Sequence, residues 1–335
     1  MKSTKLTDTK YLFISTTVAC LEGSLIEEET LTKLSDARDF DEAFRMVCDI
    51  YSARGEITFG ADEYEKMLSS ELSRAYGEID GLLESSGGEK NLLSPLRVSY
   101  DCHNLKSCIK CEALKISPDS MLVGCGNFAP EKIADMVRDR DFSCLSPILS
   151  EACTNAIDEF SATGDPQTVD IIIDKGAFLE MSDLCLRIGL PYLSKLCETK
   201  ADMCNVMTFV RCERADMSKD ILSKMLLPGG KISVDDILLC YGEKGSEKLF
   251  RRFSGVYDSF SLVENASLSE LEKLCDSIYL SFAQSVWMLA FGPEKPIMYM
   301  VRKENEIRNV RIVLSGKKAK LSSETIRERL RVCRK

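Results

Sequence analysis

Apolar residues recur along most of the chain at spacings of three and four, the period that places them on one face of a helix. Two such stripes follow an acid or serine that has a glutamate three residues later: Asp39 with Glu42, and Ser267 with Glu270. That pairing is the capping box of a helix N-terminus. The stripe behind the first pair comprises Ala43, Phe44, Val47 and Tyr51, and the stripe behind the second comprises Leu271, Leu274, Ile278 and Phe282. Both stretches are predicted to be helices that bury one face.

Clusters of turn-forming residues separate the periodic stretches. They fall at 85–91 (SSGGEKN), 161–165 (SATGD), 228–230 (PGG) and 292–296 (GPEKP). Asp165 followed by Pro166 is typical of a helix that begins at the proline. No alternating strand pattern joined by an Asn-Gly or Asp-Gly turn is found, so the sequence predicts an all-α fold.

A segment of the chain occurs three times. The copies read DCHNLKSCIKC from Asp101, DMCNVMTFVRC from Asp202 and EIRNVRIVLSG from Glu306. In each, an acid precedes an asparagine by three residues and aliphatic side chains follow at the same offsets; the asparagines are Asn104, Asn205 and Asn309. The asparagines lie 101 and 104 residues apart, and the first two copies continue alike, with Gly126 and Ile133 matching Gly230 and Ile237.

This spacing is too long for a solenoid, whose repeats run to about 20–50 residues, and indicates three similar helical units of about a hundred residues. The approximate boundaries expected from the spacing are 1–115 with the N-terminal helix, 116–217, and 218–335 with the basic C-terminal segment. Copies of one unit tend to pack around a pseudo-symmetry axis. We therefore expect pseudo-three-fold symmetry around a central concavity, a funnel or socket.

Composition fits a globular chain without a membrane span. Of 335 residues, 44% are hydrophobic and 29% charged, and no apolar run approaches the roughly 18–20 residues that a spanning helix needs. Any membrane contact is therefore expected to be peripheral. The 15 cysteines are odd in number and scattered among apolar helical residues, which favours reduced, buried thiols.

Charge is uneven: the last forty residues carry 12 Lys or Arg against four Glu, a net +8 on a chain whose total is −9. A basic tail can bind nucleic acid, but no RNA-reading motif accompanies this one. Its arginines alternate with apolar residues at helical spacing, so either solvated helix faces or a docking face for a protein partner are favoured. If the segment docks, we expect the partner surface to be acidic. The candidate docking residues are Arg327, Arg329 and Arg331.

Candidate chemistry centres on Cys108 and Cys111, with Cys102 and His103 upstream. Three Cys and one His could complete a zinc tetrahedron, or a cysteine could act as a nucleophile. However, there is no second CxxC, and adjacent residues of a helix point to different sides. The other two copies of the segment replace His103, the only histidine, by Cys204 and Arg308. We interpret these cysteines as structural thiols.

The three repeated acids have a structural interpretation too. Asp101, Asp202 and Glu306 share one offset from an asparagine, which favours capping or hydrogen bonding at equivalent helix positions over acid-base catalysis. The Gly-rich stretches at 124–126 and 228–230 lack the spacing of a phosphate loop. The sequence thus predicts no catalytic residue, no cofactor and no metal.

Five segments together resemble the C subunit of bacterial and archaeal V/A-type ATPases, whose eukaryotic relative is the d subunit of the vacuolar ATPase. They are DARDFDEAFRMVCD (36–49), DCHNLKSCIKC (101–111), DPQTVDIIIDKGAF (165–178), LLPGGKIS (226–233) and ENEIRNVRIVLSGKKAKLSSETIRERLR (304–331). One departure is that Thr17 and Ala19 stand where the family's first helix carries arginines, so no contact of those arginines is carried over.

The resemblance implies a non-catalytic, three-lobed helical socket on the cytoplasmic side of a rotary ATPase. Its expected partners are the central shaft subunits and the membrane rotor ring, and its expected role is to couple them for proton or sodium transport, in ATP synthesis or hydrolysis. The alternative is a soluble helical enzyme with a cysteine nucleophile or a metal near Cys108 and Cys111. Nucleic-acid binding through the tail is the weakest hypothesis, because the remainder of the chain is acidic.

Overall fold

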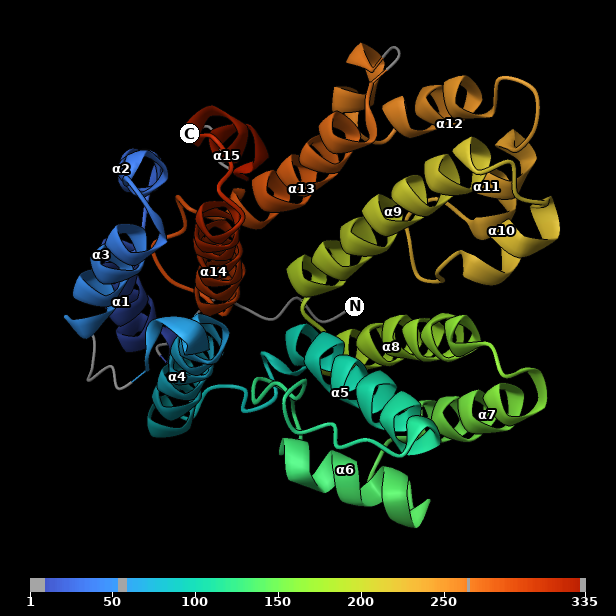
Figure 1. Cartoon of the computed structure of the whole chain (residues 1–335), viewed down its shortest axis with the longest axis horizontal. Coiled ribbons are helices and arrows are strands. Elements are labelled where there is room, and N and C mark those ends of the chain that lie inside the picture. Colours follow the sequence, from blue (N-terminus) through green and yellow to red (C-terminus); the bar gives the residue numbers. More distant parts are fainter. Residues whose placement is uncertain (1–9, 54–58, 264–265, 332–335) are drawn as a thin grey trace. The chain divides into compact units, whose positions relative to one another are not determined.

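The structure is a computed structural model that describes residues 10–53, 59–263 and 266–331. Across those ranges it is helical and contains no strand, which confirms the predicted all-α fold. The chain divides into two compact units (Figure 1). Unit 1 combines residues 1–90 with 283–335, and unit 2 comprises residues 91–282.

The helices begin where the sequence signals place them. Asp39 accepts a hydrogen bond from the backbone N–H of Glu42 at 2.9 Å, and Ser267 and Glu270 exchange bonds at 2.8 and 3.2 Å. The carboxylate of Asp165 accepts from the N–H of Gln167 at 2.9 Å. All three predicted N-termini are confirmed, because a cap depends on residues next to it in the chain.

Unit 1 is organised around one long helix, α14, which is buried on several sides. Its members are α1 (Lys10–Glu22), α2 (Glu28–Asp36), α3 (Phe40–Ser52), the short 3-10 turn Ala61–Glu63, α4 (Tyr64–Ser86), α14 (Glu294–Lys318) and α15 (Ser323–Arg329). Helix α14 contacts α1, α2, α3, α4 and α15 (Figure 1). Residues from opposite ends of the sequence therefore share one core, with Val310 and Leu314 of α14 fully buried in it.

Unit 2 contains two successive groups of helices. The first group is α5 (Ser94–Leu114), α6 (Pro130–Asp139), α7 (Pro147–Thr163) and α8 (Pro166–Ile188). Helix α5 packs on α6 and α8, and α7 packs on α8. Gly176 allows the close approach of α7, because a Cβ there would lie 2.7 Å from that of Ala152.

The second group of unit 2 includes the long helix α9. It comprises α9 (Pro191–Arg214), α10 (Lys219–Met225), α11 (Val234–Cys240), α12 (Gly245–Ser254), the 3-10 helix Asp258–Leu262 and α13 (Leu268–Gln284). Helix α9 contacts α8, α10 and α12. Its core is a cluster of buried apolar side chains that includes Val206, Phe209, Leu249 and Phe253.

Two further expectations from the sequence concern a membrane span and the division into three units. Within the described ranges, no helix is both long and apolar enough to span a bilayer. The repeated segments begin in α5, α9 and α14, so two copies lie in unit 2 and one in unit 1. The division into three symmetric parts stays a prediction.

Candidate functional site

The repeated asparagines each hold one residue of a loop that comes later in the chain. All three are buried, at 0–2% exposure. Each side-chain Nδ2 donates to the carbonyl, and each Oδ1 accepts from the N–H, of a single loop residue, over 2.7–3.0 Å. The pairs are Asn104 with Val123, Asn205 with Leu227, and Asn309 with Arg331. The amide thus satisfies its own donor and acceptor and two buried backbone groups at once.

The first two repeated acids hold the same loops further along. Asp101 accepts from the backbone N–H groups of Asn127 and Phe128 at 3.0 and 3.1 Å. Asp202 accepts from those of Lys231 and Ile232 at 3.1 and 3.3 Å. We call each acid with its asparagine an acid–asparagine pair. The pairs Asp101–Asn104 and Asp202–Asn205 each fix one loop to the helix at two points one turn apart.

Two glycines allow the loop backbone to reach these carboxylates. A Cβ on Gly126 would lie 2.1 Å from Oδ1 of Asp101, and one on Gly230 would lie 2.2 Å from Oδ1 of Asp202. Both distances are far below van der Waals contact, so only glycine fits without moving the loop. This close approach explains why glycine stands at both matching positions of the sequence repeat.

The third acid takes its backbone partner from the other end of the chain. Oε2 of Glu306 accepts from the N–H of Ile26 at 2.7 Å, although the two residues are 280 positions apart. Ile26 lies two residues before α2, just as Phe128 and Ile232 lie two residues before α6 and α11. In all three cases the acid therefore binds the residue two positions before a short helix. For Glu306 of α14 that residue belongs to the N-terminal part of the chain.

Burial governs the titration of the two aspartates. It raises the pKa of Asp101 and of Asp202, and the hydrogen bonds that each carboxylate accepts act in the opposite direction. The hydroxyl of Tyr257 also donates to Asp202 at 2.7 Å, and burial together with that carboxylate raises the pKa of the tyrosine. Both carboxylates accept hydrogen bonds from donors of the protein itself. This supports a structural role for the two aspartates over acid-base catalysis.

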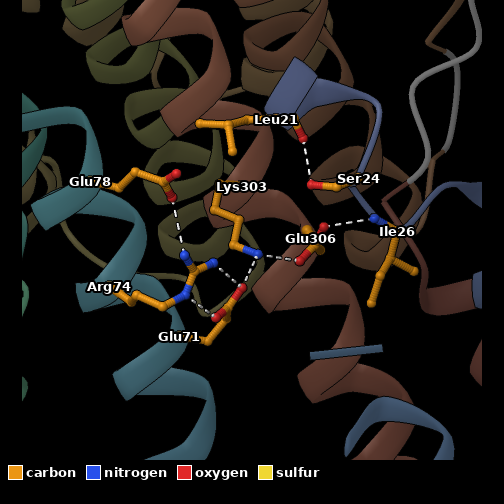
Figure 2. Close-up of polar contacts among 8 residues, drawn as sticks. All are labelled: Leu21, Ser24, Ile26, Glu71, Arg74, Glu78, Lys303 and Glu306. Carbon is orange, nitrogen blue, oxygen red and sulfur yellow. Dashed lines mark hydrogen bonds and ion pairs between the residues drawn. The ribbon is translucent and has the colours of Figure 1, made fainter. Parts of the chain in front are cut away.

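Glu306 also belongs to a buried cluster of charges in unit 1, drawn in Figure 2 and called here the Lys303 cluster: Glu71, Arg74, Lys303 and Glu306. Lys303 is fully buried and donates to Glu71 at 2.7 Å and to Glu306 at 2.6 Å. Arg74 donates to both oxygens of Glu71 at 2.9 and 3.0 Å, and hydrogen bonding to Glu71 raises the pKa of Arg74. The cluster joins α4, α14 and, through Ile26, the segment before α2.

Sequence reasoning missed Lys303. Its aliphatic stem follows a run of buried residues in α14, and its ammonium group also lies 5.1 Å from the ring centre of Tyr51. The available signal was a lysine three residues before Glu306 that lies two residues after the apolar run 297–301. A lysine beside such a run usually has a buried partner, because an unpaired buried charge is costly.

The cysteines near the first acid–asparagine pair lack the properties of a reactive site. Burial raises the pKa of Cys108 to about 11 and that of Cys102 well above its usual value. A thiol held in its protonated form is a poor nucleophile and a poor metal ligand. His103 is exposed, and its Nε2 lies 3.0 Å from the carbonyl oxygen of Met121. Within the described residues no group of three or more potential ligands could hold a metal ion.

The three candidate docking arginines differ in their surroundings. Arg327 forms an ion pair with Asp36, on α2 of the same unit. The backbone of Arg331 is bound by Asn309, and its guanidinium donates to the carbonyl of Arg329 at 2.6 Å. The side chain of Arg329 is exposed. Arg327 is exposed as well, but its ion pair holds it against α2, so Arg329 is the better candidate for an outside contact.

Large apolar side chains are exposed in the turn before α14, and we call them the Trp287 surface: Trp287, Met288 and Leu289. Leu12 and Phe13 of α1 are exposed as well. Trp287 and Met288 are 66% and 78% exposed. The turn that carries them is fixed, because Lys295 donates to the carbonyl of Trp287 at 2.6 Å and the N–H of Gly292 donates to Ser15 of α1 at 3.2 Å. A held, exposed group of large apolar side chains is typical of a protein contact.

These observations define an all-helical protein whose repeated polar residues hold loops in place. Comparison with known proteins gives the family: the ATP synthase (C/AC39) subunit family matches residues 14–329, and the chain belongs to it. Subunits of this family are non-catalytic members of their complex.

The similarity to individual relatives extends over most of both chains. The C subunit of the V-type sodium ATPase of Enterococcus hirae is 25% identical over 277 residues, which cover 81% of this chain and 84% of that protein. The C subunit of the A-type ATP synthase of Methanosarcina acetivorans is 24% identical over 341 residues, covering 96% of this chain and 92% of the relative. The resemblance drawn from the five sequence segments is confirmed.

The steric role of Gly126 predicts a position-specific effect of an added methyl group. Gly126→Ala should lower the free energy of unfolding by about 1–3 kcal/mol, because the loop must move away from Asp101. Gly124→Ala is the matched control, since a Cβ there meets nothing within 4 Å, and its effect should stay within about 0.5 kcal/mol. Urea unfolding of both variants measures the difference. Equal midpoints would contradict the close approach at Gly126.

The Lys303 cluster predicts a large cost for removing its central cation. Lys303→Met keeps most of the side-chain volume but leaves Glu71 and Glu306 buried without their shared partner, so it should destabilise the chain by about 3–5 kcal/mol. Lys33→Met, which removes an exposed ion pair with Glu29, should leave the unfolding midpoint nearly unchanged. A Lys303→Met protein as stable as the Lys33→Met protein would show that the cluster contributes little.

Proposed function

We propose that this chain is the central-stalk subunit of a V/A-type rotary ATPase, and that it joins the rotating shaft to the membrane rotor ring. The observation that carries the proposal is the family match across residues 14–329. The relatives, which are C subunits of a V-type sodium ATPase and of an A-type ATP synthase, support the same assignment. The chain would act on the cytoplasmic side of the membrane, and the rotor ring would determine whether protons or sodium ions are carried.

We further propose that the three acid–asparagine pairs mark three similar helical units around a central concavity. The pairs support this division because each asparagine binds both backbone groups of one later residue, and each acid binds a residue two positions before a short helix. The third unit would draw on both ends of the chain, since Glu306 binds Ile26. That arrangement changes the boundaries expected from sequence, which assign the two ends to different units.

A mechanical role makes specific demands on such units. Torque passes through a coupling subunit by contact, so its loops must resist displacement under load. Paired hydrogen bonds to buried backbone groups and a buried charge cluster supply such resistance, because breaking them would leave buried polar atoms unsatisfied. The polar residues repeated in the sequence would thus serve stiffness.

Two surfaces of unit 1 are suited to contact other subunits. The Trp287 surface offers large apolar side chains, the type that is enriched at the centre of protein interfaces. Arg329 offers an accessible cation in a segment of net positive charge, suited to an acidic surface. We assign both to contacts with neighbouring subunits of the ATPase.

The stalk role predicts that loss of the chain separates the two activities of the complex. In membrane vesicles from cells lacking the chain, ATP hydrolysis by the soluble head should persist while ATP-driven ion uptake is lost. Uptake should return when the wild-type chain is restored. Coupled uptake at the normal rate without the chain would refute the proposed function.

The Trp287 surface predicts an assembly defect without loss of folding. Trp287→Ser combined with Met288→Ser should reduce the amount of chain retained in the detergent-solubilised complex, because the apolar contact is lost. Leu186→Ser in α8 is the matched control, since that leucine is also 78% exposed. Equal retention of the two variants at equal unfolding midpoints would place the Trp287 surface outside the interfaces.

The basic tail predicts a salt-dependent association. Arg329→Glu should slow reassembly of the chain with the stripped complex at low salt, and the difference from wild type should shrink above about 0.1 M salt because exposed charges are screened. Lys248→Glu, an exposed charge reversal outside the tail, is the control. Identical association rates for the two variants at low salt would confine Arg329 to a solvated surface.

A further inference from the structure

Two thiols meet where α8 ends and α9 begins. Cys185 lies in the last turn of α8 and Cys197 in the second turn of α9, with Sγ atoms 3.4 Å apart. The tight connection that brings them together contains Gly189, whose φ of 71° lies in the left-handed region, and Pro191 at the start of α9. A disulfide needs an S–S distance of about 2.05 Å, so a small side-chain movement separates the thiol pair from a covalent bond.

Two other sulfur contacts, each between a cysteine and a methionine, lack this capacity. Cys48 faces the sulfur of Met67 at 3.8 Å, and Cys212 faces that of Met225 at 3.7 Å. A thioether cannot form a disulfide with a thiol. The contact between α8 and α9 is therefore chemically different from these packing contacts.

The two thiols of the pair have different acid–base properties. Cys185 donates its S–H to Cys197, and accepting that bond lowers the pKa of Cys197, an effect that Lys200 supports and that burial and Glu198 oppose. Donation and burial raise the pKa of Cys185. By contrast, burial raises the pKa of Cys153 to about 12. Cys197 thus has the character of an attacking thiol and Cys185 that of a resolving thiol.

We propose that Cys185 and Cys197 form a redox site that a hydroperoxide oxidises to an intramolecular disulfide. The Cys197 thiolate attacks one oxygen of hydrogen peroxide, the O–O bond breaks, and the released hydroxide takes up a proton to give water and Cys197 sulfenic acid. Sγ of Cys185 then attacks Sγ of Cys197, the S–O bond breaks, and hydroxide leaves as water with the proton of Cys185. Two thiols lose two electrons in total, and one peroxide becomes two waters.

The disulfide would change the junction between two copies of the repeat. It would close the loop from 185 to 197 and fix α8, which packs on the helix of the first acid–asparagine pair, to α9, which carries the second. Relative movement of these helices would then be restricted. The redox site depends on this thiol pair and not on the proposed function.

The test treats the reduced full-length chain with hydrogen peroxide, blocks remaining thiols with N-ethylmaleimide under denaturing acidic conditions, and analyses tryptic peptides by mass spectrometry. The expected product links peptide 176–187 to peptide 196–200, with a mass two hydrogens below the sum of the reduced peptides. Cys153→Ser removes another buried thiol and should leave this product unchanged.

A second measurement traps the intermediate. In Cys185→Ser the sulfenic acid has no resolving thiol, so dimedone should label Cys197 at least about tenfold more than Cys153. The proposal is overturned if peroxide oxidises the exposed Cys20 and Cys144 while Cys185 and Cys197 remain free thiols. It is also overturned if dimedone labels Cys197 and Cys153 equally in that variant.

Discussion

A buried side-chain amide must find partners for both its oxygen and its nitrogen, and this requirement organises the long helices α5, α9 and α14. Each carries one asparagine that meets it by binding both backbone groups of a single loop residue. The acid one turn earlier binds the backbone two residues before a short helix, which is α6 for Asp101, α11 for Asp202 and α2 for Glu306. On α5 and α9 one loop is thus fixed at two points, whereas α14 holds two segments from opposite ends of the chain.

The Lys303 cluster lies in the unit that contains both ends of the chain, and it too satisfies buried polar groups. Glu306 binds the backbone of Ile26, and Lys303 neutralises it while pairing with Glu71 of α4. Because removal of one partner would leave a buried charge alone, the contacts depend on one another. Such dependence would suit the proposed coupling role, because no single contact of the cluster could break without exposing the others to the cost of an unpaired charge.

The features predictable from sequence were those set by neighbouring residues or by repetition. Asp39, Ser267 and Asp165 marked helix starts because caps are local, and the recurring acid and asparagine revealed the repeated segment. The partners of those residues could not be predicted, because the bonds from Asn104 to Val123 and from Glu306 to Ile26 depend on packing between distant segments. The charge pattern that makes Arg327 a candidate docking residue does not reveal its ion pair with Asp36. That ion pair arises from the same long-range packing.

The dependence of the N-terminal segment on Glu306 is tested most directly by amide hydrogen exchange at Ile26. In the wild-type chain this amide should exchange slowly, like the amides of Phe128 and Ile232, because each is bound by a buried carboxylate. In Glu306→Ala, exchange at Ile26 should accelerate to the rate of an exposed loop amide, while Phe128 and Ile232 stay slow. Fast exchange at Ile26 in the wild-type chain, or an unchanged rate in the variant, would contradict the binding of the N-terminal segment by Glu306 of α14.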